Sequence, residues 1–101
     1  MNEVYNKTIL VALEHLLIIK FRPTFLALTY NQDYDIIEIV MSANQFDYMS
    51  VSERIAHVFM EIQRNLPQVL KEHLIVVQPF SGEQMEDVLE DLFGSINDTD
   101  A

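Results

Sequence analysis

The sequence predicts a small α+β protein in which a three-stranded sheet packs against helices, in the order helix, strand, strand, helix, strand, helix. The main observation is a change of periodicity across residues 36–66. Residues 36–41 are rich in β-branched side chains, which favours a strand. From residue 51 to about residue 65, apolar residues recur at helical spacing: Ile55, Val58, Phe59, Ile62 and then Leu66. Between them, Ser50 followed by Glu53 fits a capping box, which indicates the start of that helix.

Residues 3 to about 19 predict the first helix. Their apolar residues fall on one side, while Lys7 and Glu14 fall on the other. The end of this helix, residues 16–19, is apolar nearly all round. We therefore expect that end to be buried or to contact a partner.

The first two strands are expected to form an antiparallel hairpin. Arg22-Pro23 stops the helix, because proline has no N–H and favours extended geometry in the residue before it. Residues 25–30 predict the first strand, and the polar residues 31–33 supply a turn. The third strand follows a helical crossover, so we expect a mixed sheet.

The remaining elements are marked by prolines, glycines and a second capping box. Pro67 either breaks the second helix or starts a further short turn through residue 70. Residues 74–77 predict the third strand, which Pro79 is expected to end. Residues 81–84 resemble a capping box before a last helix, which Gly94 is placed to terminate. The prediction is a single domain over residues 1–94 and an acidic flexible tail over residues 95–101.

Composition excludes several classes of protein. The 101 residues carry a net charge of −10, which opposes binding to nucleic acid and to anionic membranes. No apolar run approaches the roughly 18 to 20 residues that a membrane span needs. The chain has no cysteine, which excludes disulfides and fits a cytoplasmic protein. Seven acids crowd the end of the chain from Glu83 to Asp100, and no basic residue lies beyond Lys71. They form a solubilising face or a docking surface for a basic partner.

No motif predicts an enzyme. The only glycines are Gly82 and Gly94, so there is no phosphate-binding loop, and no paired-histidine metal motif occurs. His15, His57 and His73 are far apart in sequence. The element order resembles KH-type nucleic-acid modules, but their GxxG loop is missing and the charge has the wrong sign.

Three segments resemble the BolA-like family. Residues 21–26 (FRPTFL) are similar to the family's first-strand start. Residues 40–46 (VMSANQF), followed by Ser50 and Arg54, resemble the pattern VxSxxFxGxSxxxRH. Residues 73–81 (HLIVVQPFS), with Met85 where tryptophan is usual, resemble HALx[IL]xxxTPxEW. The resemblance covers roughly residues 9 to 86.

This resemblance implies a non-enzymatic accessory protein in iron–sulfur or stress-related regulation. Such proteins partner monothiol glutaredoxins and share a [2Fe-2S] cluster, to which the glutaredoxin supplies thiolates. The family's histidine ligand corresponds to His73, and Phe46, Ser50 and Arg54 match its partner-binding motif. Imidazole is a good iron ligand, and replacing thiolates by histidine raises the cluster potential.

The sequence also departs from the family pattern. The short turn over residues 31–35 has no histidine or cysteine, so the second cluster ligand is missing, and Ile55 replaces the histidine after Arg54. His73 is either a ligand or a structural residue that bonds a backbone group at the start of the third strand. Arg54 is either a partner contact or a surface residue paired with Glu53 or Glu61. His57 could lie near His73.

Three functional hypotheses follow. The first is the BolA-like accessory protein with a glutaredoxin partner. The second is a cofactor-free interaction module, in which the acidic last helix and the leucine-rich first helix bind a partner or form a homodimer. The third is a BolA-type transcriptional regulator that binds DNA through the second helix and the loop before it. Arg54, Arg64 and Lys71 are few positive charges against a net charge of −10.

Overall fold

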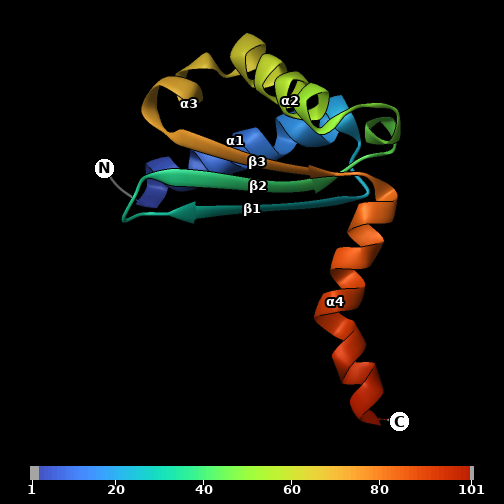
Figure 1. Cartoon of the computed structure of the whole chain (residues 1–101). Helices are drawn as coiled ribbons and strands as arrows, with labels where there is room; N and C mark the ends of the chain where they lie inside the picture. Colours follow the sequence, from blue (N-terminus) through green and yellow to red (C-terminus); the bar gives the residue numbers. More distant parts are fainter. Residues whose placement is uncertain (1–2, 101) are drawn as a thin grey trace.

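A computed structural model describes residues 3–100, with side chains described from residue 7 to residue 91. The predicted fold class is confirmed (Figure 1). The structure adds a short helix, η1, that was not predicted, and it forms a short helix, α3, where a further turn after Pro67 was left open. The elements in chain order are α1 (Glu3–Phe21), β1 (Phe25–Asn31), β2 (Ile36–Ser42), η1 (Asn44–Tyr48), α2 (Val51–Asn65), α3 (Pro67–Glu72), β3 (Leu74–Phe80) and α4 (Gly82–Asp100).

The sheet is mixed, as predicted, with the strand order β1-β2-β3. The hairpin strands β1 and β2 are antiparallel, and Phe25 lies opposite Ser42. After the crossover through α2 and α3, β3 runs parallel to β2, and Leu74 lies opposite Ile36. The start of β3 therefore lies beside the end of the β1–β2 turn.

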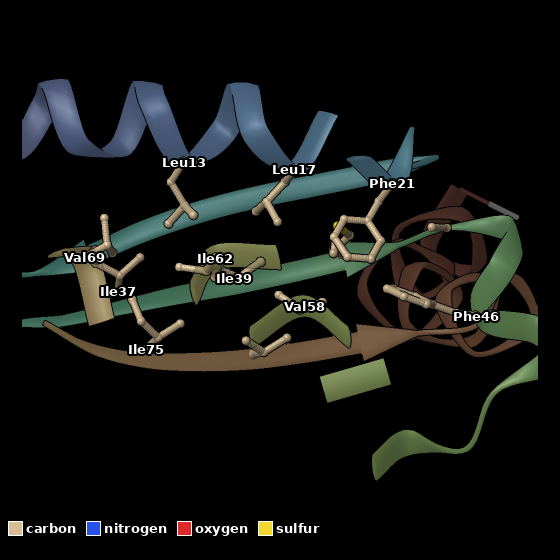
Figure 2. Close-up of a cluster of buried hydrophobic side chains, with 13 residues drawn as sticks. Leu13, Leu17, Phe21, Ile37, Ile39, Phe46, Val58, Ile62, Val69 and Ile75 are labelled. Carbon is tan, nitrogen blue, oxygen red and sulfur yellow. The ribbon is translucent and has the colours of Figure 1, made fainter. Parts of the chain in front are cut away.

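The hydrophobic core lies between one face of the sheet and helices α1 and α2 (Figure 2). Side chains along β2 alternate between the two faces of the sheet, which places Ile37, Ile39 and Met41 on this face. Helical spacing on α1 and α2 supplies the opposing layer, and the residues that are fully buried there are Leu13, Leu17, Val58 and Ile62. Figure 1 shows α4 extending away from the other side of the sheet.

Both predicted capping boxes are present. Ser50 Oγ accepts from the Glu53 backbone N–H at 3.2 Å, and the Ser50 N–H donates to Glu53 Oε1 at 3.0 Å. At α4, Ser81 and Gln84 exchange the equivalent pair of hydrogen bonds. Each box satisfies two backbone donors that a helix start leaves free.

Two predictions about proline were partly wrong. Pro79 was expected to end β3, but it lies inside the strand. Because β3 is an edge strand, its outer side carries no hydrogen-bond ladder that a missing N–H could interrupt. Arg22-Pro23 does stop α1, at Phe21, but Arg22 has a φ of 47° where extended geometry was expected. Its N–H donates to the Ile18 carbonyl, which makes it a left-handed helix cap.

Pro67 has both of the roles considered for it. It follows the end of α2 at Asn65, and it is the first residue of α3.

The prediction that Gly94 ends the last helix was wrong. Helix α4 continues through Gly94 to Asp100, because a single glycine lowers helix stability without breaking the hydrogen-bond ladder. The predicted flexible tail falls within this helix except for residue 101, which lies outside the described residues. Within the described part of the chain, no helix is long and apolar enough to cross a membrane.

Candidate functional site

The candidate site is centred on His73, which caps α3 and precedes β3. Its position follows from the parallel pairing of β2 and β3, which brings the first residues of the two strands together. Asp35, the last residue of the β1–β2 turn, therefore lies beside His73. Its carbonyl also accepts from the Leu74 N–H at 3.2 Å.

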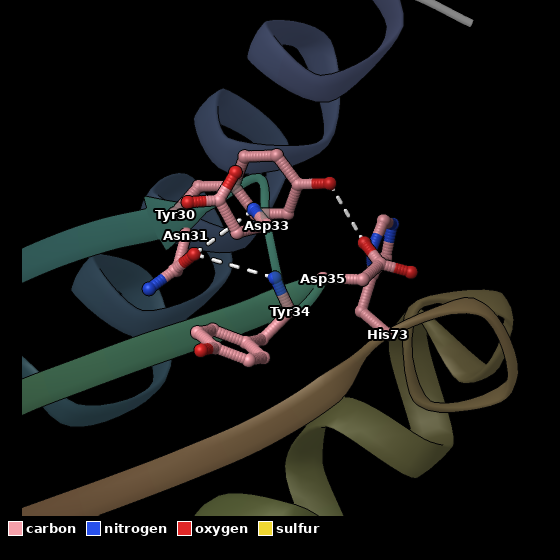
Figure 3. Close-up of polar contacts among 6 residues, drawn as sticks. All are labelled: Tyr30, Asn31, Asp33, Tyr34, Asp35 and His73. Atoms are coloured by element: carbon pink, nitrogen blue, oxygen red, sulfur yellow. Dashed lines mark hydrogen bonds and ion pairs between the residues drawn. The ribbon is translucent and has the colours of Figure 1, made fainter.

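Three side chains form one polar cluster, shown in Figure 3. His73 Nδ1 lies 2.8 Å from Asp35 Oδ1, and the Tyr30 hydroxyl donates to the same oxygen at 2.7 Å. The rings of Tyr30 and His73 meet edge to face, with centroids 5.8 Å apart. A carboxylate can only accept, so His73 Nδ1 carries the proton in this contact.

The two sides of the imidazole differ in their surroundings. The His73 side chain is 5% exposed, whereas that of Asp35 is 52% exposed. His73 Nε2 is buried and has no hydrogen-bond partner among the described residues. In the neutral imidazole that carries its proton on Nδ1, the unpartnered Nε2 presents a lone pair. Histidines that bind metals share this arrangement, in which a carboxylate holds the other ring nitrogen.

The electrostatics of the cluster favour an ionised Asp35. The hydrogen bond from Tyr30, followed by that from His73, holds the pKa of Asp35 below its ordinary value of 3.8. The turn before it is shaped by Asn31, whose Oδ1 accepts from the N–H groups of Asp33 and Tyr34 at 3.0 and 3.3 Å. Asp35 itself has a φ of 55°, a conformation that aspartate tolerates better than most residues.

The three residues that match the partner-binding motif are mostly turned inward. Phe46 is fully buried in the core. Ser50 is exposed, and its hydroxyl is used to cap α2. Arg54 is 7% exposed, so the interpretation of a surface arginine paired with Glu53 or Glu61 was wrong.

Arg54 instead connects three segments of the fold. Its Nε donates to the carbonyls of Phe46 and Met49 at 2.9 and 3.1 Å, within and just after η1. Its Nη1 donates to the Pro79 carbonyl at 3.3 Å and to Gln84 Oε1 at 2.7 Å. The planar guanidinium suits this role because it presents several donors in fixed directions.

The other histidines do not join His73. His57 packs edge to face on Phe21, with ring centroids 5.0 Å apart. Phe21 precedes the start of β1, which pairs with the end of β2, whereas His73 lies at the start of β2 and β3. The expectation that His57 could lie near His73 was therefore wrong. Among the described residues, no group of three or more metal-ligating side chains comes together.

Sequence reasoning missed Asp35 and Tyr30, and it missed the contact of Gln84 with Arg54. Asp35 and Tyr30 flank a short turn, and their contact with His73 depends on the pairing of β2 with β3 across 38 residues. A parallel register is not visible in the sequence. The second capping box did identify Gln84, but only the tertiary structure shows that it also accepts from Arg54.

Comparisons with known proteins identify the fold. No protein-family model and no curated protein matches the sequence. Three solved structures are similar over most of their length: BolA1 from Arabidopsis thaliana, the BolA domain of SufE1 from Arabidopsis thaliana, and a Bol-like protein from Babesia bovis. Their TM-scores are 0.60, 0.63 and 0.61 at identities of 13%, 11% and 19%. In the same order, the matched regions cover 72%, 73% and 74% of this chain. They cover 90%, 92% and 86% of the three similar chains. The chain therefore has the BolA-like fold, as the three sequence segments implied.

Proposed function

We propose that this chain, which has the fold of BolA proteins, is a divergent BolA-type accessory protein that acts by binding a protein partner. The partner is a monothiol glutaredoxin, and His73 is the ligand that this chain contributes to a shared [2Fe-2S] cluster. No catalytic role is proposed for the chain. The SufE1 neighbour, in which a BolA domain is one part of a named protein, supports a role that depends on association with other proteins.

The observation that carries this proposal is the unpartnered Nε2 of His73. A buried ring nitrogen without a hydrogen bond is unfavourable, and a metal ion is one ligand that would satisfy it. Asp35 holds Nδ1 and so fixes the orientation of the ring. This chain offers one ligand here, because the turn between β1 and β2 contains neither histidine nor cysteine. The remaining ligands come from the partner.

The ring must be uncovered before Nε2 can reach a ligand held by another protein. The turn over residues 32–35 is the segment that can uncover it, since its residues are exposed and, among the described residues, only Asp35 ties it to His73 and Leu74. Asp35 is in this turn and contacts His73, so partner binding and ring exposure are coupled through one residue. When bound, the cluster supplies redox or cluster-transfer chemistry. His73 serves to bind the cluster, and Asp35 serves to orient the His73 ring.

The direct test mixes the protein with a cluster-loaded monothiol glutaredoxin and records visible absorption and circular dichroism. Wild type should change the spectrum, and His73→Ala should abolish that change. His15→Ala is the matched control, because His15 is an exposed histidine on α1, and it should behave as wild type. The proposal fails if wild type neither binds the glutaredoxin nor alters its spectrum.

A cofactor-free interaction module is the second candidate function. Helix α4 extends away from the sheet, and five of its acids, Glu83, Glu86, Asp87, Glu90 and Asp91, are exposed. Such a surface suits a basic partner. Equal affinity of wild type and His73→Ala for every partner would favour this candidate.

DNA binding by a BolA-type regulator has the least support. Arg54 is buried and donates to carbonyls and Gln84, so it is not available for a phosphate. Binding to duplex DNA that weakens steeply with salt near physiological ionic strength would reverse this ranking.

A further inference from the structure

The edge strand β1 lacks the features that usually protect a sheet edge. Within residues 3–100 its one strand partner is β2, so alternate N–H and C=O groups point away from the sheet. Its seven residues, FLALTYN, include no charged residue and no proline. The other edge strand, β3, contains Pro79. An unprotected apolar edge of this length is a site where another strand can pair.

Helix α1 continues the same surface above β1. Ile18 shares a surface hollow with Phe25 and Leu26, the first residues of β1, so this side of α1 borders the free edge. Val11 lies two turns earlier on that side. Val11 and Ile18 are 51% and 45% exposed, although both are large apolar residues. An uncovered apolar row beside an uncovered strand edge indicates one continuous interface.

The distribution of charge selects the occupant of this surface. Residues 3–31 contain Glu3, Glu14, Lys7, Lys20 and Arg22, which sum to +1, so the rest of the chain carries −11. A second copy of this acidic protein is repelled by most of the molecule, and the repulsion is smallest on this face. A surface with nearly balanced charges and exposed apolar residues, on a strongly acidic protein, therefore suits another copy of the chain.

We propose that the protein forms a two-fold symmetric dimer in which the β1 strands of two copies pair antiparallel. The result is a continuous six-stranded sheet in the order β3-β2-β1-β1-β2-β3, with the two α1 helices side by side above its centre. This arrangement is isologous, because the same edge and the same helix face are used by both copies.

The spacing of charges on α1 fits this symmetry. If the axis passes beside Leu28, the middle of β1, it lies about 10 Å along the strand from Phe25. The same distance back along α1 from Ile18 is about seven residues, which reaches Val11. Lys7 and Glu14 then lie on opposite sides of the axis, so Lys7 of each copy faces Glu14 of the other copy.

The dimer leaves the site at His73 unaltered. His73 lies at the end of the sheet where β1 finishes, and the two-fold axis places the two His73 residues at opposite ends of the dimer. The inference therefore goes beyond the proposed function, and either one can fail without the other.

The test measures molar mass by sedimentation or light scattering across a concentration series. Wild type should have twice the mass of one chain at about 100 μM, which is a hundredfold above a micromolar dissociation constant. Val11→Glu should raise the dissociation constant at least about tenfold, since it places like charges of the two copies near the axis. Ile18→Glu should also raise it, since it places a charge in the apolar row of the interface. Met60→Glu is the matched control, because Met60 is 45% exposed on α2, and it should remain dimeric.

Amide hydrogen exchange locates the interface. In the dimer all β1 amides between Phe25 and Asn31 should be protected, whereas in Val11→Glu the alternate, outward amides should exchange fast. Far-ultraviolet circular dichroism checks that the variants are folded. A monomeric wild type at about 100 μM, a dimeric Val11→Glu, or β1 amides that exchange alike in both proteins would overturn the proposal.

Discussion

Arg54 of α2 donates through Nη1 to Gln84 Oε1 of α4 across 2.7 Å, and this contact joins two helices that lie on different sides of the sheet. Gln84 also accepts from the Ser81 N–H, so one side chain both caps α4 and receives the guanidinium. The residue that resembles a partner contact in the sequence therefore holds η1, the end of β3 and the start of α4 together.

Replacing Arg54 should destabilise the fold strongly. Arg54→Met removes a buried charged donor and leaves three carbonyls and the Gln84 amide oxygen without it. We expect the free energy of unfolding to fall by about 2–4 kcal/mol, measured by urea denaturation. Arg54→Lys should restore little, because one ammonium cannot span these acceptors. Arg64→Met, at an exposed position of the same helix, should change stability by no more than about 0.5 kcal/mol.

Asp35 should make stability depend on pH in the acid range. Its pKa is lower in the folded chain than the ordinary value of 3.8, so the ionised carboxylate stabilises the fold. This contribution is present in full above 3.8 and is lost as the pH falls through the lower folded pKa. Asp35→Asn should flatten this part of the pH profile of urea midpoints, while keeping the left-handed backbone that asparagine also tolerates.

The control for this prediction is Asp33→Asn, an exposed aspartate of the same turn, which should keep the wild-type profile. Asp35→Asn should also weaken the spectral change with cluster-loaded glutaredoxin, since Asp35 orients His73. A variant with the wild-type pH profile would show that the contacts of Asp35 with Tyr30 and His73 do not form in solution.

Asp47 should stabilise the start of α4. Its Oδ1 accepts from the Gly82 N–H at 3.0 Å, so η1 supplies a cap to a helix 35 residues later. Asp47→Ala should speed amide exchange over residues 82–85 about fivefold, which corresponds to ~1 kcal/mol. Glu86→Ala, an exposed acid of the next turn, should leave these rates unchanged. Equal rates in both variants would mean that Ser81 and Gln84 suffice as the cap.

Arg22 occupies a backbone conformation that glycine adopts more easily. With a φ of 47° after the last residue of α1, Arg22→Gly should raise stability by about 0.5–1 kcal/mol in thermal unfolding. The same change at Lys20, inside the last turn of α1, should lower stability by about 1 kcal/mol. Destabilisation by both substitutions would contradict a left-handed cap at Arg22.

The sequence by itself determined the order of the elements, because helices and strands have local signals. Ser50 with Glu53 and Ser81 with Gln84 marked two helix starts, and the β-branched run over residues 36–41 marked the central strand. The same local signals failed at Pro79 and Gly94, where position in the sheet and the continuing helix ladder outweighed residue preference.

Only the tertiary structure decided the roles of Arg54, Asp35 and the edge of β1. The sequence motif suggested that Arg54 lies on the surface. In the structure its side chain is buried, and it donates to carbonyls of η1 and β3. Asp35 meets His73 only because β2 and β3 pair in a parallel register, which depends on side-chain packing across many residues. The free edge of β1 follows from strand order, which short-range patterns do not specify, since strand pairing is a non-local interaction.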